Sequence, residues 1–129
     1  MSEETRLRKG TIVLHTKKSY IGIVRFNLRA RADLLTPRGV VAGVKTKNLI
    51  PLQEAAGDPN HRGAYLAALE KLPEGSCLID GIGDVWHKTC SAWKCLDSAF
   101  AELEEWACSY RVRVSFPVLG TKQIDKKEV

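Results

Sequence analysis

Short apolar runs rich in β-branched residues make up much of the first 46 residues of the chain, and turn-forming residues separate them. The runs cover residues 11–15, 20–26 and 40–46, and the second continues with alternating polarity as far as residue 31. Runs of this length and composition predict β-strands. Because the connections between them are short, we expect the three strands to pair as an antiparallel meander.

A helical pattern follows this meander. Asp58 and Pro59 predict the start of a helix, because an Asp side chain accepts from the free N–H groups of a first turn. Pro has no N–H group to leave unpaired at that point. Apolar residues then recur at helical spacing over residues 65–72, and Pro73 and Gly75 end the pattern.

The remainder of the chain predicts a strand over residues 76–80, a long helix over about residues 89–109 and a last strand over residues 111–116. The full order is then β-β-β-α-β-α-β, a mixed sheet of the α/β class at its border with α+β. Strands joined through helices predict parallel pairing in this half of the chain. The 129 residues have the length of a single domain. We expect its polar ends, residues 1–9 and 122–129, to be flexible tails.

The net charge of +5 is unevenly distributed. Residues 1–50 hold eleven Lys and Arg against three acidic residues, a net charge of +8, whereas residues 51–129 carry a net charge of −3. If the basic side chains gather on one face, they predict a surface for a polyanion, although they could equally solvate one side of a sheet. We expect Arg25, Arg29 and Arg31 to alternate onto one side and to contact phosphates without reading base sequence. The candidate nucleic-acid-binding residues are Lys17, Lys18, Arg25, Arg29, Arg31 and Arg38.

Two carboxylates flank a Gly-x-Gly bend at the predicted end of the 76–80 strand. Asp80 and Asp84 are the candidate metal ligands, since paired carboxylates suit Mg²⁺ and ligands collect at the carboxyl ends of strands. His87 follows closely and could transfer a proton, so the candidate catalytic residues are Asp80, Asp84 and His87. The alternative is a plain turn, because Asp and Gly favour turns for conformational reasons.

The cysteines and the chain start bear on the cellular compartment. The chain has four cysteines, no secretory signal pattern and no apolar run long enough to cross a membrane, so we expect a cytoplasmic protein with reduced thiols and no membrane partner. His87, Cys90 and Cys95, with Cys77 or Cys108, are zinc-binding residue types. They lack the paired spacing of zinc knuckles, so we expect no zinc site.

The three tryptophans divide between two predicted roles. Trp93 and Trp106 share a face of the 89–109 helix, and we expect both to pack in the core. Trp86 lies beside the Gly-x-Gly bend, where its ring could stack against a base.

Three stretches resemble the ribonuclease H-like superfamily, and the order of a meander followed by crossovers is also the order of that fold. Residues 13–26, VLHTKKSYIGIVRF, are similar in rhythm to the opening strand and hairpin of RuvC-like resolvases. The helical residues 65–72, followed by CLIDGIGD over residues 77–84 and by His87, resemble a segment of endonuclease V. SFPVLGTK over residues 115–122 loosely resembles a later stretch of that family, Pro-x-x-Gly-x-x-Lys, with one residue fewer before the Lys.

The resemblance implies a nuclease that uses divalent metal ions. The sequence departs from the family pattern at two points, because His15 stands where the family has its first catalytic Asp and the 58–72 helix has no Glu in its first turn. Loss of the first-strand carboxylate would remove a ligand common to both metal ions. The departure leaves open both a nuclease and a relative that binds nucleic acid without cleaving it.

The sequence therefore predicts a small protein with a ribonuclease H-like fold that binds DNA or RNA, either as a Mg²⁺-dependent nuclease or as a degenerate relative that does not cleave. One alternative is a non-enzymatic accessory protein, of the kind found on mobile elements, whose basic surface binds an acidic protein partner. Another is a small-molecule enzyme that holds phosphate on the loop over residues 81–84, although a single Gly-x-Gly is a short signal for it.

Overall fold

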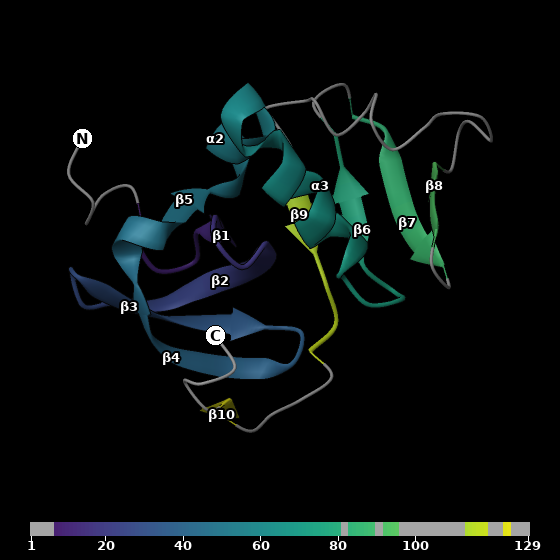
Figure 1. Cartoon of the computed structure of the whole chain (residues 1–129). Coiled ribbons are helices and arrows are strands. Elements are labelled where there is room, and N and C mark those ends of the chain that lie inside the picture. Colours follow the sequence, from purple (N-terminus) through teal and green to yellow (C-terminus); the bar gives the residue numbers. More distant parts are fainter. Residues whose placement is uncertain (1–6, 81–82, 90–91, 96–112, 119–122, 125–129) are drawn as a thin grey trace.

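The computed structural model describes residues 7–80, 83–89, 92–95, 113–118 and 123–124 of the chain. Its strands form two sheets, which Figure 1 shows side by side with helix α3 between them. The strands are β1 (Ile12–His15), β2 (Tyr20–Asn27), β3 (Arg31–Thr36), β4 (Gly39–Lys45), β5 (Leu49–Pro51), β6 (Cys77–Ile79), β7 (Val85–Thr89), β8 (Ala92–Cys95), β9 (Arg113–Ser115) and β10 (Gln123–Ile124). The helices are η1 (Thr46–Asn48), α2 (Leu52–Ala56), η2 (Pro59–His61) and α3 (Arg62–Glu70).

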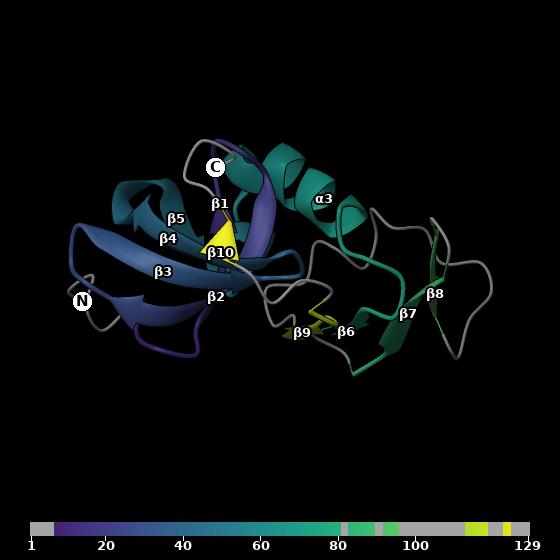
Figure 2. The same cartoon turned by 90° about the horizontal axis from the view of Figure 1, so that it is seen from below.

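The larger sheet has the strand order β10-β4-β3-β2-β1-β5, and the smaller sheet has the order β8-β7-β6-β9. All neighbouring strands are antiparallel except β10 and β4, which pair in parallel. Figure 2 shows the same arrangement from below, with the smaller sheet beyond one end of the larger sheet. The described chain is thus of the α+β class. No helix in this part of the chain is both long and apolar enough to cross a membrane.

The predicted antiparallel pairing is confirmed for the first two strands, β1 and β2. The predicted pairing of the second strand with the strand at residues 40–46 is wrong, because β3 lies between β2 and β4. The second strand does not continue to residue 31, because the Asn27 side chain accepts from the Arg29 N–H at 2.7 Å and turns the chain there. Strand β3 follows and pairs with both β2 and β4. Sequence analysis missed β3 because Asp33 is atypical of strands. In the fold the Asp33 carboxylate accepts from the Gly43 N–H at 3.0 Å, where the β3–β4 register shifts.

Strand β5 returns to the start of the sheet and pairs with the free side of β1. The short helix η1 makes this return possible. Thr46 in η1 donates its hydroxyl to the Arg29 carbonyl oxygen at 2.7 Å, and the Asn48 carbonyl oxygen accepts from the Thr16 N–H at 2.8 Å. The end of β4 is therefore tied both to the β2–β3 turn and to the β1–β2 turn.

The predicted helix start at Asp58 is also confirmed. The Asp58 carboxylate accepts from the Asn60 N–H at 2.9 Å and contacts His61 Nδ1 at 2.8 Å, and these contacts lower the pKa of Asp58. The chain makes one 3₁₀ turn, η2, before α3 begins. Tyr65 and Leu69 on α3 are buried, as their helical spacing predicts.

Two clusters of buried side chains lie on the two faces of the larger sheet. One cluster joins Leu14 of this sheet to Leu69 of α3 and to Leu78 and Trp86 of the smaller sheet. The other is built from side chains of β1 to β5 together with Leu7. Leu7 is fully buried, so the fold begins inside the segment predicted as an N-terminal tail. Strand β10 lies within the predicted C-terminal tail.

The predicted helix over residues 89–109 is wrong where the structure describes it. Residues 85–89 and 92–95 form the hairpin of β7 and β8, and residues 96–109 lie outside the described residues. Trp93 and Cys95 point inward while Ala92 and Lys94 are exposed, which is a period of two. The predicted parallel pairing is likewise wrong for the predicted strands at residues 76–80 and 111–116, since β6 and β9 are antiparallel.

A buried lysine links the smaller sheet to α3. Lys88 on β7 donates its ammonium to the carbonyl oxygens of Leu69, at 3.3 Å, and Glu70 at the carboxyl end of α3. Its Nζ atom lies 5.8 Å from the centre of the Trp93 ring. Burial lowers the pKa of Lys88, although the nearby Glu70 charge acts in the opposite direction. A cation at this position complements the negative end of the helix dipole and satisfies carbonyl groups that a helix end leaves free.

We expect Lys88→Met to lower the free energy of unfolding by about 1–3 kcal/mol, because buried helix-end carbonyl groups lose their donor. Urea unfolding near neutral pH, compared with the wild type, measures this change. Lys94→Met, which removes an exposed charge from the neighbouring strand β8, is the matched control. Equal or higher stability of Lys88→Met would mean that the cost of burying the ammonium exceeds its gain.

Candidate nucleic-acid interface

Four basic side chains surround a hollow beside the β2–β3 hairpin. This hairpin hollow has a volume of about 610 Å³. Its lining residues are Arg8, Lys9, Arg25, Phe26, Asn27, Leu28 and Arg29. No acidic side chain is among these described lining residues, so the hollow has a positive potential.

Phe26 is exposed in this hollow because of a bulge in β2. Val24 pairs with Leu34 and Phe26 pairs with Asp33, so Arg25 is the extra residue of the bulge. The bulge interrupts the alternation of β2, and two consecutive side chains, Arg25 and Phe26, are both exposed. Half of the Phe26 surface is accessible to solvent. A large aromatic ring is therefore displayed at the surface of a small protein.

Two cations lie over the Phe26 ring. The Lys9 Nζ atom is 5.8 Å from the ring centre, and the Arg25 Cζ atom is 5.7 Å from it. At these distances a cation is attracted by the negative face of the ring. Leu28, at the hairpin turn, is also exposed. The hollow thus combines positive charge with apolar surface.

Arg29 occupies the turn of the hairpin in a strained backbone conformation. Its φ angle is +73°, in the left-handed region that Gly and Asn adopt more readily. Such a conformation costs on the order of 1 kcal/mol or more for an Arg. The Thr46 hydroxyl bond to the Arg29 carbonyl oxygen helps to hold it. The conformation belongs to the short turn that the Leu28 N–H closes by donating to the Arg31 carbonyl oxygen at 2.8 Å.

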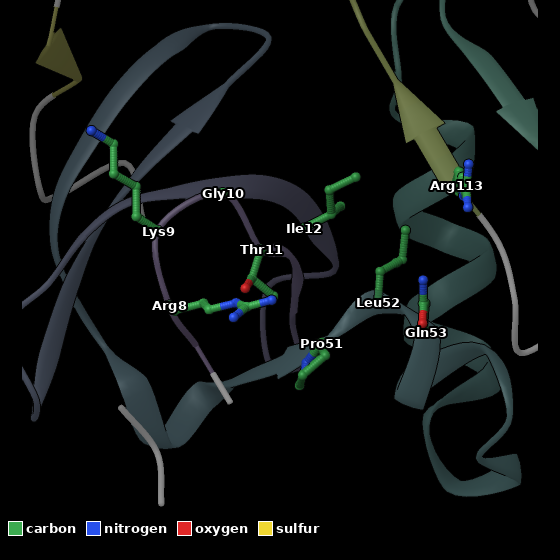
Figure 3. Close-up of a pocket in the computed structure, with 9 residues that line it drawn as sticks. All are labelled: Arg8, Lys9, Gly10, Thr11, Ile12, Pro51, Leu52, Gln53 and Arg113. Carbon is green, nitrogen blue, oxygen red and sulfur yellow. The ribbon is translucent and has the colours of Figure 1, made fainter. Parts of the chain in front are cut away.

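A second hollow, of about 460 Å³, lies beside the N-terminal segment (Figure 3). Its lining residues are Arg8, Lys9, Gly10, Thr11, Ile12, Pro51, Leu52, Gln53 and Arg113. Figure 3 shows Arg8 pointing toward the space between Thr11 and Pro51, while Lys9 points the other way. Gly10 fixes the segment to the sheet through a 2.8 Å bond from its N–H to the Val24 carbonyl oxygen. Arg8 and Lys9 line both hollows.

The predicted basic row is divided by the fold. Arg25 and Arg29 line the hairpin hollow, but Arg31 lies on β3 and donates to the Gly43 carbonyl oxygen at 2.9 Å. Lys17 and Lys18, in the β1–β2 turn, line a third hollow together with Arg31. The three arginines do not alternate along one strand, because β2 ends at Asn27.

One predicted binding residue lies away from these hollows, and two residues that line them were not predicted. Arg38 lies in the β3–β4 turn, where its N–H donates to the Thr36 hydroxyl at 3.2 Å, and it lines none of the three hollows. Sequence analysis missed Arg8 and Lys9 because it assigned them to a tail. The apolar residue Leu7 beside them was the signal available in the sequence.

The Asp80–Asp84 bend is a hydrogen-bonded turn between β6 and β7. The two carboxylate oxygens of Asp80, a buried residue, accept from the Asp84 N–H and from the Trp86 indole N–H, each at 3.0 Å. Trp86 is 2% exposed, so the prediction that its ring could stack against a base is wrong. The Asp80 side chain fixes the turn and satisfies the indole group.

His87 does not lie on the bend. It is half-buried on β7, opposite Cys77 of β6 and Lys94 of β8. Within the part of the chain that the structure describes, no group of three or more His, Cys, Asp or Glu side chains is arranged to hold a metal ion. A Mg²⁺ ion at Asp80 and Asp84 stays a prediction.

The cysteines that the structure describes are both free thiols. Cys77 is half-buried on β6 and Cys95 is buried on β8. Cys95 was predicted on a helix, and the structure places it on a strand. Cys90 and Cys108 lie outside the described residues.

His15 closes the β1–β2 turn. It is 4% exposed, its Nδ1 atom accepts from the Lys18 N–H at 3.0 Å, and its ring stacks on Tyr20 with 4.9 Å between the ring centres. Burial and the neighbouring Lys18 charge lower the pKa of His15 below its ordinary value of 6.5. His15 is therefore a neutral ring that holds a turn.

Comparisons of the chain with protein-family models, with curated proteins and with solved structures give no match. Function is therefore inferred from the chain's own side chains.

The lowered pKa of His15 makes stability depend on pH. Because the folded protein disfavours protonated His15 while the unfolded chain accepts the proton near pH 6.5, the His15 contribution is complete above that pH and is lost as the pH falls toward the lower folded pKa. We expect urea unfolding to show a smaller drop between about pH 7.5 and pH 5 in His15→Asn, which keeps an acceptor that does not titrate. Equal drops in the variant and the wild type would assign the pH dependence to other groups.

We expect Asp80→Asn to lower the free energy of unfolding by about 1–3 kcal/mol in EDTA, because an amide donor replaces one of the two buried acceptors. Urea unfolding with EDTA and with Mg²⁺ separates the two roles of Asp80. Unchanged stability in EDTA would contradict the role in the turn. A Mg²⁺-dependent stabilisation present in the wild type and absent in Asp80→Asn would support the predicted metal site.

Proposed function

We propose that this protein binds single-stranded nucleic acid, with phosphates on the basic residues of the hairpin hollow and a base stacked on Phe26. The observation that carries the proposal is the exposed Phe26 ring among Arg8, Lys9, Arg25 and Arg29. Arg and Lys side chains bind the phosphate backbone without sequence preference. In proteins that bind single-stranded nucleic acid, unpaired bases stack on exposed aromatic rings.

An acidic protein partner is the alternative occupant, and the exposed aromatic ring favours nucleic acid over it. Carboxylates of a protein could pair with the cations of the hollow, but they would leave the Phe26 face without a flat partner. A nucleic-acid strand supplies both groups, a base as the flat partner of the ring and phosphates for the cations. Stacking contributes about 1–3 kcal/mol per base and tolerates every base, since each has a π face.

We propose binding without cleavage as the main activity. The wider possibility of a ribonuclease H-like nuclease is supported by the position of Asp80 and Asp84 together at one turn after β6. Both Asp80 oxygens already accept hydrogen bonds within that turn, however. In the resemblance to the superfamily, His15 stands where the first catalytic Asp would be, and its ring holds a turn. Among the described residues, these contacts favour binding of phosphates over their cleavage.

Fluorescence anisotropy with labelled single-stranded DNA and RNA tests the binding. We expect Arg25→Gln to weaken binding to all sequences and to reduce the slope of log K against log salt by about 0.7, the value for one phosphate contact on a single strand. Lys94→Gln, which removes the same charge from β8, is the control and is expected to leave the slope unchanged. Equal effects of the two variants would mean that only net charge matters.

We expect Phe26→Ala to raise the Kd for single strands about 5- to 150-fold and to affect duplexes much less, because only an unpaired base can stack on the ring. Ile79→Ala, which shortens another exposed apolar side chain, is the matched control. Equal losses for duplex and single strand would contradict the stacking role. Absence of binding to any nucleic acid would overturn the proposal and favour a protein partner. Gels of the same mixtures with Mg²⁺ or EDTA detect cleavage.

A further inference from the structure

A third hollow, lined by basic side chains, lies where the end of β4 meets the β1–β2 turn. This closure hollow has a volume of about 300 Å³. Its cations are Lys17 and Lys18 from the turn, Arg31 from the start of β3 and Lys45 from the end of β4. None of the described residues that line it is acidic. Four cations from three separate segments therefore converge on one concave surface.

The frame of the closure hollow is held by hydrogen bonds that do not use the side chains of Lys17, Lys18 or Lys45. The Lys18 N–H donates to buried His15, and the Lys18 carbonyl oxygen accepts from Lys71 at 2.8 Å. On the opposite side, the Arg31 guanidinium donates to the Gly43 carbonyl oxygen. The lysine ammonium groups of Lys17, Lys18 and Lys45 lie on exposed residues of this frame. Such an arrangement suits an anion that is reached from solvent.

The closure hollow and the hairpin hollow lie on either side of the β2–β3 turn. Arg29 lines the hairpin hollow and Arg31 lines the closure hollow. Only Ala30 lies between these two arginines, so their Cα atoms are no more than about 7 Å apart. A chain of phosphates that passes over this turn meets cations on both sides of it.

We propose that the closure hollow holds phosphates of the same nucleic-acid strand that occupies the hairpin hollow, with the strand crossing the β2–β3 turn between them. This inference rests on the proposed function and adds the path of the ligand to it. A strand long enough to reach both hollows makes more phosphate contacts than a short one. Its affinity and its salt dependence are therefore greater.

Binding of short and long oligonucleotides tests the path. Single strands of about 4 and about 16 nucleotides cover the range of site sizes known for OB folds that bind single strands. We expect the double variant Lys18→Gln, Lys45→Gln to weaken binding of the long strand and to reduce its salt slope by about 1.4, two single-strand contacts, while binding of the short strand is unchanged. Arg25→Gln is the comparison, because it removes a contact that both lengths make. Thermal unfolding confirms that each variant is folded.

The outcomes separate the two proposals. If the wild type binds neither length, the proposed function fails. If the wild type binds both lengths and the double variant weakens both equally or neither, the hairpin hollow binds nucleic acid and the path across the turn is wrong. Inorganic tripolyphosphate gives a further arm: tight binding that the double variant abolishes, with long-strand affinity unchanged, would show that the closure hollow takes a separate anion and would also overturn the path.

Discussion

Strand β1 pairs on both sides and is buried on both faces, and the rest of the fold is arranged around it. Val13 packs into the cluster formed by β1 to β5, whereas the next residue, Leu14, packs toward α3 and the smaller sheet. A strand with this double burial tolerates no shift of register, because a shift by one residue would exchange the two faces. The chain is also held on either side of β1. At the carboxyl end His15 holds the β1–β2 turn, and before the amino end Gly10 ties the N-terminal segment to β2.

Local signals predicted the parts of the fold that depend on neighbouring residues in the sequence. The cap at Asp58 works through the next three residues, so the sequence alone was enough to predict it. Strand β3 and the β7–β8 hairpin depend on pairing with neighbouring strands, which the residue pattern of one segment does not reveal. Asp33 is acceptable in a strand only because Gly43 supplies an N–H group, and Trp93 fits a helical spacing as well as a strand. In both places tertiary pairing outweighed the local pattern.

The candidate site was predictable in its charge and not in its shape. The excess of basic residues in the first half of the chain pointed to a polyanion, and Arg25 and Arg29 do line one hollow. Strict alternation would have buried Phe26, and only the bulge at Arg25 exposes it. No spacing rule locates a bulge in a single sequence. At Asp80 and Asp84 the residue types did not distinguish a metal site from a turn, because Asp suits both. Here both Asp80 oxygens accept hydrogen bonds from residues of the turn and of β7.

The same features that expose the hairpin hollow lower the stability of the free protein. A net charge of +8 in residues 1–50 repels itself, and the left-handed Arg29 and the bulge at Arg25 add strain and lost pairing. Burial keeps His15 neutral and so avoids one further positive charge beside Lys18. Bound phosphates would cancel part of the repulsion, so that a ligand of the folded state would raise its stability by mass action.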